Sequence, residues 1–201
     1  MNHPTELCQM FSKYRSDKCP EVSHSYSPVY FEYLQHRKED FKNILEIGIG
    51  TESLMRPICG ENYQVGASLK AWRDFFIHAS IFGVDIDRSV LFEEERIKCF
   101  FTDQSNKQQL LNTIADIRHF KNDPELLFDL IIDDGSHDVN HMILSFSTLK
   151  DYVTSGGLYI IEDIKKIDLS LFQSLSFPKW KIIKVHEGNN YWDAFIIYQT
   201  N

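Results

Sequence analysis

Two short apolar runs in this chain each end in a pair of adjacent carboxylates. The first lies within Phe128–His137 (FDLIIDDGSH) and the second within Gly156–Asp163 (GGLYIIED). Apolar runs of this length between helical segments are typical of buried parallel strands, which all end at the same edge of their sheet. If the two strands are neighbours, four acids crowd that edge: Asp133, Asp134, Glu162 and Asp163.

Carboxylates that close together do not all stay ionised unless a cation lies among them. An oxygen-only ligand set suits Mg²⁺ or Mn²⁺. His137 follows Asp134 by three residues. The pattern therefore predicts a divalent metal beside a general base, with a helix-capping role as the alternative for His137.

Helices and strands that alternate along the chain must position these acids. Helical spacing of apolar residues predicts helices over 26–36, 68–77, 106–120 and 139–152, and a short one over 169–175; apolar runs predict strands over 43–47, 80–84, 97–102, 128–132 and 158–161. The segments 180–185 and 194–198 predict a hairpin that turns at Glu187–Asn190. The expected fold class is α/β, with a doubly wound, mostly parallel sheet and a C-terminal antiparallel hairpin.

The other half of the expected site lies at the ends of the first three strands, where ligands of such sheets bind. Glu46 can face a cationic amine, beside a turn that contains Gly48 and Gly50. Asp85 and Asp103 end the next two strands, where acids can bond a ribose and an adenine amino group. An amine, a ribose and an adenine together describe S-adenosylmethionine. The alternative gives the glycines to a tight turn and the two acids to helix N-caps.

A dinucleotide fits the glycine turn less well. The turn departs from GxGxxG because Glu52 and Ser53 follow it, and we expect the next helix only from about Ser68, after a turn-rich segment over 51–66.

The length and the net charge of the chain limit which classes of protein it can belong to. The 201 residues predict one domain, 1–201, with an N-terminal helical segment (1–40) and a core (41–201). A net charge of −8 argues against general binding to nucleic acid or anionic membranes. The four cysteines show no metal-finger spacing, and there is no signal peptide or run of about 20 apolar residues. We therefore expect a soluble, cytoplasmic protein with reduced thiols.

Several motifs, taken in order, resemble one known family. They are Glu46–Gly50, Gly66–Trp72, Phe82–Ile86, Asp103–Ser105, Ile132–His137 and Gly156–Asp163, preceded by Ser16–Lys18 and His24–Tyr26. This set is similar to the metal-dependent sugar O-methyltransferases of macrolide and tetracenomycin biosynthesis. Those enzymes are class I S-adenosylmethionine-dependent methyltransferases that methylate a hydroxyl of a deoxysugar, often a rhamnose-type ring. The resemblance covers about residues 14–164.

The resemblance implies a Rossmann-like class I fold and a role for each site residue. Asp134, Glu162 and Asp163 would bind Mg²⁺ (or Mn²⁺), and His137 would be the catalytic base. S-adenosylmethionine would be bound by Glu46, Gly48, Gly50, Ser68, Asp85, Asp103, Gln104 and Asp133.

The implied acceptor is a sugar or glycoside, with neither nucleic acid nor membrane as partner. Family members often carry an additional N-terminal domain that helps them to oligomerise and shapes the acceptor pocket. The resemblance therefore leaves the assembly of this short chain open between a homo-oligomer and one part of a larger glycan-modifying enzyme. Two other functions stay open: a catechol- or phenol-type O-methyltransferase, and a non-catalytic module that binds a nucleoside. Tyr191 and Trp192 could form the floor of a sugar-binding site, although an ordinary hairpin edge is the favoured interpretation.

Overall fold

The computed structural model describes residues 4–165, 167–174, 180–184 and 192–200. The α-helices and short 3₁₀ turns in these ranges are α1 (Glu6–Tyr14), α2 (Tyr26–Leu34), α3 (Glu52–Cys59), α4 (Ala67–Phe75), η1 (Arg88–Val90), α5 (Lys107–Lys121), α6 (Val139–Leu149), η2 (Lys150–Tyr152) and α7 (Leu169–Ser174). The strands are β1 (Asn43–Ile47), β2 (Ser80–Asp85), β3 (Glu93–Glu94), β4 (Ile97–Phe101), β5 (Phe128–Asp133), β6 (Val153–Lys165), β7 (Trp180–Lys184) and β8 (Trp192–Gln199).

Within the described ranges the strands form one sheet in the order β3-β4-β2-β1-β5-β6-β8-β7. The strands β4, β2, β1, β5 and β6 are parallel, while β8 and β7 run antiparallel at one end and β3 at the other. The order reverses at β1, which has β2 on one side and β5 on the other. The predicted fold class is confirmed.

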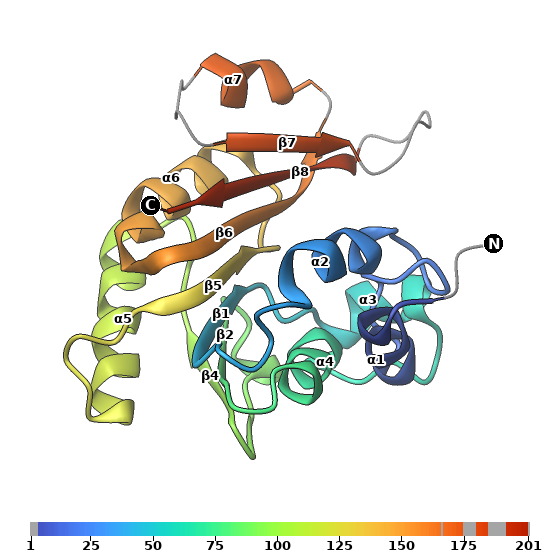
Figure 1. The fold of residues 1–201 in the computed structure, drawn as a ribbon, viewed down its shortest axis with the longest axis horizontal. Coiled ribbons are helices and arrows are strands. Elements are labelled where there is room, and N and C mark those ends of the chain that lie inside the picture. The colour runs from blue at the N-terminus through green and yellow to red at the C-terminus, as the bar shows by residue number, and fades with distance from the viewer. Residues whose placement is uncertain (1–3, 166, 175–179, 185–191, 201) are drawn as a thin grey trace.

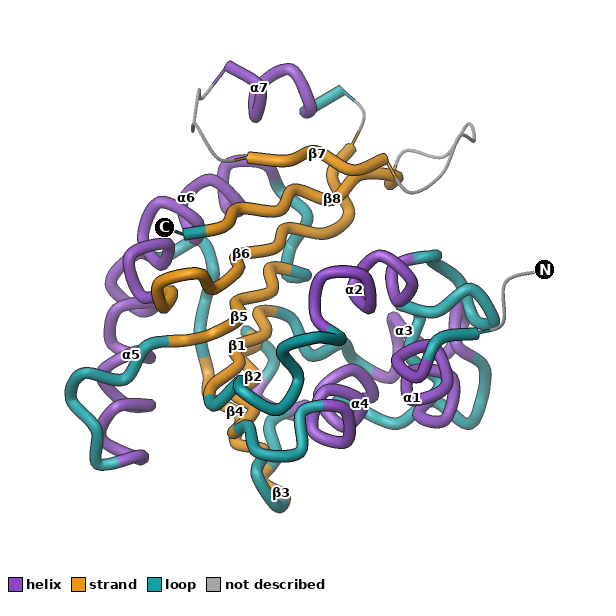
Figure 2. The backbone as a smooth tube through the Cα atoms, in the orientation of Figure 1, coloured by secondary structure: helices purple, strands orange, loops and turns teal. Residues whose placement is uncertain are grey.

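Helices cover both faces of this sheet (Figures 1 and 2). The N-terminal helices α1 and α2 lie with α4 on one face, and α5 and α6 lie on the other. Because side chains alternate along a strand, each inner strand supplies both cores. In β5, for example, Leu130 and Ile132 pack on the α1/α4 face, whereas Ile131 packs on the α5/α6 face.

One expectation about helices was wrong. The expected N-terminal helical segment contains α1, capped by the Thr5 side chain and anchored by buried Leu7 and Phe11. The segment after the glycine turn, however, was expected to be rich in turns up to about Ser68, and α3 begins there at Glu52. Its N-cap, Thr51, accepts a hydrogen bond from the Leu54 N–H, so the capping signal was present in the sequence.

The closing hairpin is confirmed in its strands, β7 and β8, which pair antiparallel. Its predicted turn at 187–190 and the Tyr191 side chain lie outside the described residues, as does the side chain of Trp192. In the part of the chain that the structure describes, no helix has both the length and the apolar character needed to cross a membrane.

Candidate active site

The strand β1 places Glu46 on the face of the sheet that α1, α2 and α4 cover. The Glu46 side chain is fully buried, and its Oε2 accepts a 2.8 Å hydrogen bond from the Trp72 indole of α4. Ser68, at the start of α4, also bonds the carboxylate. The other oxygen, Oε1, accepts no hydrogen bond from the described residues, which leaves a buried acceptor that suits a ligand amine.

The glycine turn after β1 brings that strand against the end of β5. Gly48 has φ of 92°, and a Cβ on it would lie 2.0 Å from the Asp134 carbonyl oxygen. Only glycine therefore fits where the two chain segments cross. The Asp134 N–H in turn donates to the Ile47 carbonyl at 2.9 Å, which fixes Asp134 beside the turn.

The two acids of β6 reach the same end of the sheet because the strand is irregular there. Regular alternation would point Glu162 and Asp163 to opposite faces. Instead, the pairing of β6 with β8 shifts register between Ile161 and Ile164, and Asp163 has a left-handed φ of 51°. Ile160 packs on the α1/α4 face and Ile161 in the α5/α6 core, so Glu162 follows the alternation. Ile164 packs in the α5/α6 core as well, so the alternation breaks at Asp163.

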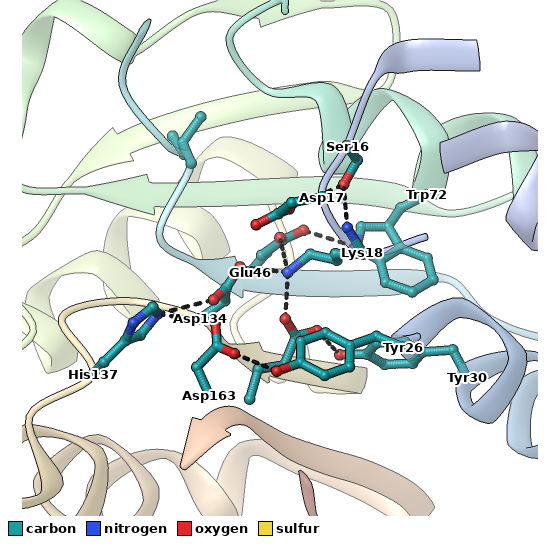
Figure 3. A network of polar contacts seen from close by, with 12 residues as sticks. Ser16, Asp17, Lys18, Tyr26, Tyr30, Glu46, Trp72, Asp134, His137 and Asp163 are labelled. Atoms are coloured by element: carbon teal, nitrogen blue, oxygen red, sulfur yellow. Dashed lines mark hydrogen bonds and ion pairs between the residues drawn. The ribbon is translucent and has the colours of Figure 1, made fainter. Parts of the chain in front are cut away.

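The strands β5 and β6 are neighbours in the sheet, as the sequence predicted, with Asp133 paired to Ile161. Asp134 and Asp163 both approach the His137 imidazole, whose Nε2 lies 3.1 Å from Asp134 Oδ1 and 3.6 Å from Asp163 Oδ2 (Figure 3). Ligand atoms of these three residues lie within 4.8 Å of one another, a spacing that a single metal ion can bridge. The two carboxylates offer the oxygen ligands that a divalent cation such as Mg²⁺ prefers, and the imidazole lies beside them, where it can serve as a base.

Glu162 lies in the same cluster but has different partners. Its Oε2 is 2.6 Å from the ammonium of Lys18, and its Oε1 accepts a hydrogen bond from the Tyr30 hydroxyl of α2. Lys18 also forms an ion pair with Asp134, and the Tyr26 hydroxyl donates to Asp163. Side chains from the segment 16–30 thus cover the acid edge of the sheet (Figure 3).

Lys18, Tyr26 and Tyr30 are the site residues that sequence reasoning missed. Each of the three residues is 1% exposed. The helical spacing over 26–36 already put Tyr30 on an apolar helix face, whereas nothing in the local pattern marks Lys18 as buried. The one available signal was positional. Ser16–Lys18 and His24–Tyr26 belong to the motifs that carried the family resemblance, but the resemblance gave them no role.

Charge and burial perturb every acid of the cluster. Burial and the nearby Asp134 hold the pKa of Asp163 above its ordinary value. Burial raises the pKa of Glu46 to about 7, and it raises that of Glu162 further still. At Asp134 burial acts in the same direction, but Lys18 and His137 outweigh it and lower the pKa. Asp134 is therefore the most firmly ionised member.

His137 responds to the same charges in the opposite sense. Burial lowers its pKa, but the bond to Asp134 and the charge of Asp163 outweigh burial and raise it. An imidazole with a raised pKa between two carboxylates can accept and retain a proton.

Asp133 and Gln104 lie apart from this cluster. The Asp133 side chain is fully buried on the α5/α6 face, where it accepts hydrogen bonds from the Gln104 amide at 2.5 Å and from the Ser145 hydroxyl of α6. Gln104 Oε1 also accepts from the Ser136 N–H. The pair ties the loop after β4 to the loop after β5, and its assignment to the cofactor stays a prediction.

Asp85 and Asp103 lie at the carboxyl edge as expected, and both have local partners. Asp85 accepts hydrogen bonds from the Ile49 and Asp87 N–H groups, each at 2.8 Å, so it braces the glycine turn. Asp103 accepts from the N–H and hydroxyl of Ser105. Neither acid is a helix N-cap: Asp87 caps η1 and Asn106 caps α5.

A cavity of about 620 Å³ opens beside the glycine turn, between α3 and the loop after β2. Thr51, Asp87 and Val90 are among its lining residues, whereas none of the acids around His137 lines it. Its lining residue Asp87 follows Asp85, the acid predicted to bind ribose, by two residues.

Comparison with known proteins places this geometry in context. The chain is 34% identical over 159 residues to the demethylmacrocin O-methyltransferase of Streptomyces fradiae, a match that covers 79% of this chain and 36% of that protein. The mycinamicin VI 2''-O-methyltransferase of Micromonospora griseorubida matches with the same identity and coverage. A tetracenomycin-C rhamnosyl 3'-O-methyltransferase of Streptomyces olivaceus is 32% identical over 163 residues, which are 81% of this chain and 38% of that protein. The chain thus spans little more than a third of the length of these relatives, and no protein-family model matches it.

Solved structures show the same likeness. The MycE methyltransferase of the mycinamycin biosynthetic pathway, in complex with Mg and SAH, superposes with a TM-score of 0.71 at 26% identity, over 99% of this chain and 56% of that one. A ribosomal RNA methyltransferase from Plasmodium falciparum superposes with a TM-score of 0.57 at 13% identity, a likeness of fold alone.

Proposed function

We infer the function of the chain from its kinship, because it has the class I methyltransferase fold and is homologous to part of the sugar O-methyltransferases of macrolide and tetracenomycin biosynthesis. We propose that it transfers a methyl group from S-adenosylmethionine to a sugar hydroxyl with the help of a divalent metal. The proposed acceptor is a rhamnose-like deoxysugar of a glycan or glycosylated natural product. The observation that carries the proposal is the convergence of Asp134, His137 and Asp163 at the end of two neighbouring parallel strands.

The cofactor half of the proposed site uses the ends of β1 and β2. Glu46 Oε1 accepts no hydrogen bond from the described residues and has only a 3.5 Å ion pair with Lys18, so it can bind the amino group of the cofactor, and Asp85 bonds the ribose. The cavity beside Thr51 and Asp87 gives the nucleoside a place beyond the end of β2, where Asp85 lies. When bound, S-adenosylmethionine supplies a sulfonium methyl group.

The metal half uses Asp134 and Asp163, with Glu162 available once its present partners release it. Mg²⁺ or Mn²⁺ bound there would acidify and orient the acceptor hydroxyl. His137 takes the hydroxyl proton, because its imidazole lies beside the carboxylates that would hold the metal. General-base help of this kind is typically worth about 10²- to 10⁴-fold.

A direct assay tests the proposal. Protein stripped of metal should transfer a labelled methyl group from S-adenosylmethionine to a rhamnoside only after Mg²⁺ or Mn²⁺ is added, and EDTA should abolish the transfer. Transfer at full rate in EDTA would remove the metal from the mechanism. A catechol acceptor run in parallel separates the sugar from the phenol chemistry, and failure to bind S-adenosylmethionine in calorimetry would reject methyl transfer altogether.

A further inference from the structure

Lys18 is a buried cation with three carboxylates around it. Its ammonium lies 2.6 Å from Glu162 Oε2 and 3.5 Å from Glu46 Oε1, and it forms a third ion pair with Asp134. The side chain is 2% exposed. Lysine is almost never fully buried unless it is paired, and Lys18 meets this condition with two hydrogen bonds, to Asp134 and Glu162, and a longer ion pair with Glu46.

Both carboxylate oxygens of Glu162 already have partners, so neither is available to bind a metal ion. One carboxylate oxygen is bonded to Lys18 and the other accepts the hydrogen bond from Tyr30. Asp134, His137 and Asp163, by contrast, already face one another at metal-ligand spacing. Glu162 can therefore join a metal site only if it gives up one of its two partners.

Charge indicates which partner leaves. A dication near Asp134 and an ammonium on the same carboxylate repel each other, whereas the neutral Tyr30 hydroxyl meets no such repulsion. In a buried site this repulsion is poorly screened. The ammonium, on a flexible four-carbon stem, is the group that can move.

We propose that Lys18 is a counter-ion of the acid cluster, which holds Glu46, Asp134 and Glu162 together and which a divalent metal displaces from Glu162 on binding. This inference rests on the proposed metal centre. Lys18 is then a positioning residue: it keeps the carboxylates in place before the metal arrives and competes with the metal for them afterwards. A lysine that only braced the site would have the opposite effect on the metal, because its loss would scatter the ligands.

The substitution Lys18→Met separates the two roles, since methionine keeps an unbranched side chain without the charge. Binding of Mn²⁺, followed by electron paramagnetic resonance, should be at least about tenfold tighter in Lys18→Met than in the wild type, which corresponds to about 1.4 kcal/mol. In EDTA the variant should unfold at a lower temperature than the wild type, and Mg²⁺ should raise its midpoint by more. Lys13→Met, which removes an exposed pair with Asp74, should change neither measurement.

The outcomes distinguish this inference from the proposed function. Equal or weaker Mn²⁺ binding by Lys18→Met, with binding by the wild type intact, overturns the counter-ion role alone. Binding by neither protein overturns the metal centre as well.

A second measurement needs no charge removal, in case Lys18→Met does not fold. In wild-type protein labelled with ¹³C at lysine Cε, the Lys18 signal, assigned through Lys18→Arg, should move on addition of Mg²⁺ more than any other lysine signal. A Lys18 signal that stays fixed while Mg²⁺ binds overturns the inference.

Discussion

His137 has an unusual backbone conformation, and its side chain lies at the exposed side of the acid cluster. Its φ is 54°, a left-handed conformation that asparagine also tolerates, and its side chain is 30% exposed. The backbone conformation aims the imidazole back at Asp134, three residues earlier in the chain. Strain of this kind is found where the surrounding structure fixes a functional side chain.

Replacing the imidazole tests its role as base. His137→Asn should lower kcat by about 10²- to 10⁴-fold and leave the affinity for S-adenosylmethionine unchanged. Because the wild-type base works unprotonated and its pKa is raised, wild-type activity should fall as the pH drops through that pKa. The variant should lack this acidic limb in its kcat profile. An unchanged kcat, or an identical limb in the variant, would exclude His137 as the base.

Asp133 gives a second prediction at the scale of one residue. Burial raises its pKa to about 6, so the folded protein binds this proton more tightly than the unfolded chain does. Its contribution to stability is therefore complete below pH 4 and is lost as the pH rises through about 6, a loss of about 3 kcal/mol for this shift.

Asp133→Asn should remove that loss. Urea unfolding at pH 4.5 and 7.5 should show that the free energy of unfolding falls less with pH in the variant than in the wild type. Asp103→Asn is the control, because Asp103 lies in an exposed turn with Ser105 and its pKa is lowered by that residue. Parallel pH dependence in wild type and Asp133→Asn would contradict the prediction.

At the scale of elements, the crossing of β1 and β5 depends on Gly48. Gly156 provides a matched control, since its φ of 74° is also left-handed but a Cβ there would meet nothing within 4 Å. Gly156→Ala should cost about 1–2 kcal/mol, the price of the conformation alone. Gly48→Ala adds a collision with the Asp134 backbone, so it should destabilise by several kcal/mol more and weaken metal binding. Equal losses in urea unfolding would show that the crossing is not tight.

The sequence predicted the elements that build the edge, because each has a clear local signal. Apolar runs located β1, β2, β4, β5 and part of β6, and helical spacing located α2, α4, α5 and α6. The crowding of the acids depended on the hypothesis that β5 and β6 are neighbours, and the register confirms that hypothesis.

What could not be predicted depends on contacts between distant residues. The bulge that turns Glu162 and Asp163 the same way is a property of the pairing between β6 and β8, and no residue type in β6 specifies it. Lys18 has polar neighbours, Ser16 and Asp17, and so looks like a solvated charge; its burial follows from carboxylates more than a hundred residues away. The early start of α3 is different, because Thr51 and Glu52 carried a readable capping signal.

At the scale of the whole molecule, a cation should stabilise the fold. The acids of the cluster come from β1, β5 and β6, and α2 lies over them, so a bound ion would tie several elements together. Mg²⁺ at 100 times its dissociation constant should raise the free energy of unfolding by about 2.7 kcal/mol. NaCl at matched ionic strength should not, and Asp134→Asn should abolish the effect of Mg²⁺. Equal stabilisation of Asp134→Asn would place the ion elsewhere.

The ion pairs of Lys18 also bear on the order in which the chain folds. Lys18 is separated by 116 residues from Asp134 and by 144 from Glu162. Contacts between such distant positions form slowly, because a long loop must close first. A nascent chain has to be synthesised beyond Glu162 before this lysine can meet its last partner. Bonds that form only after the transition state change the unfolding rate and not the folding rate. We therefore expect stopped-flow measurements to show faster unfolding of Lys18→Met and a nearly unchanged refolding rate.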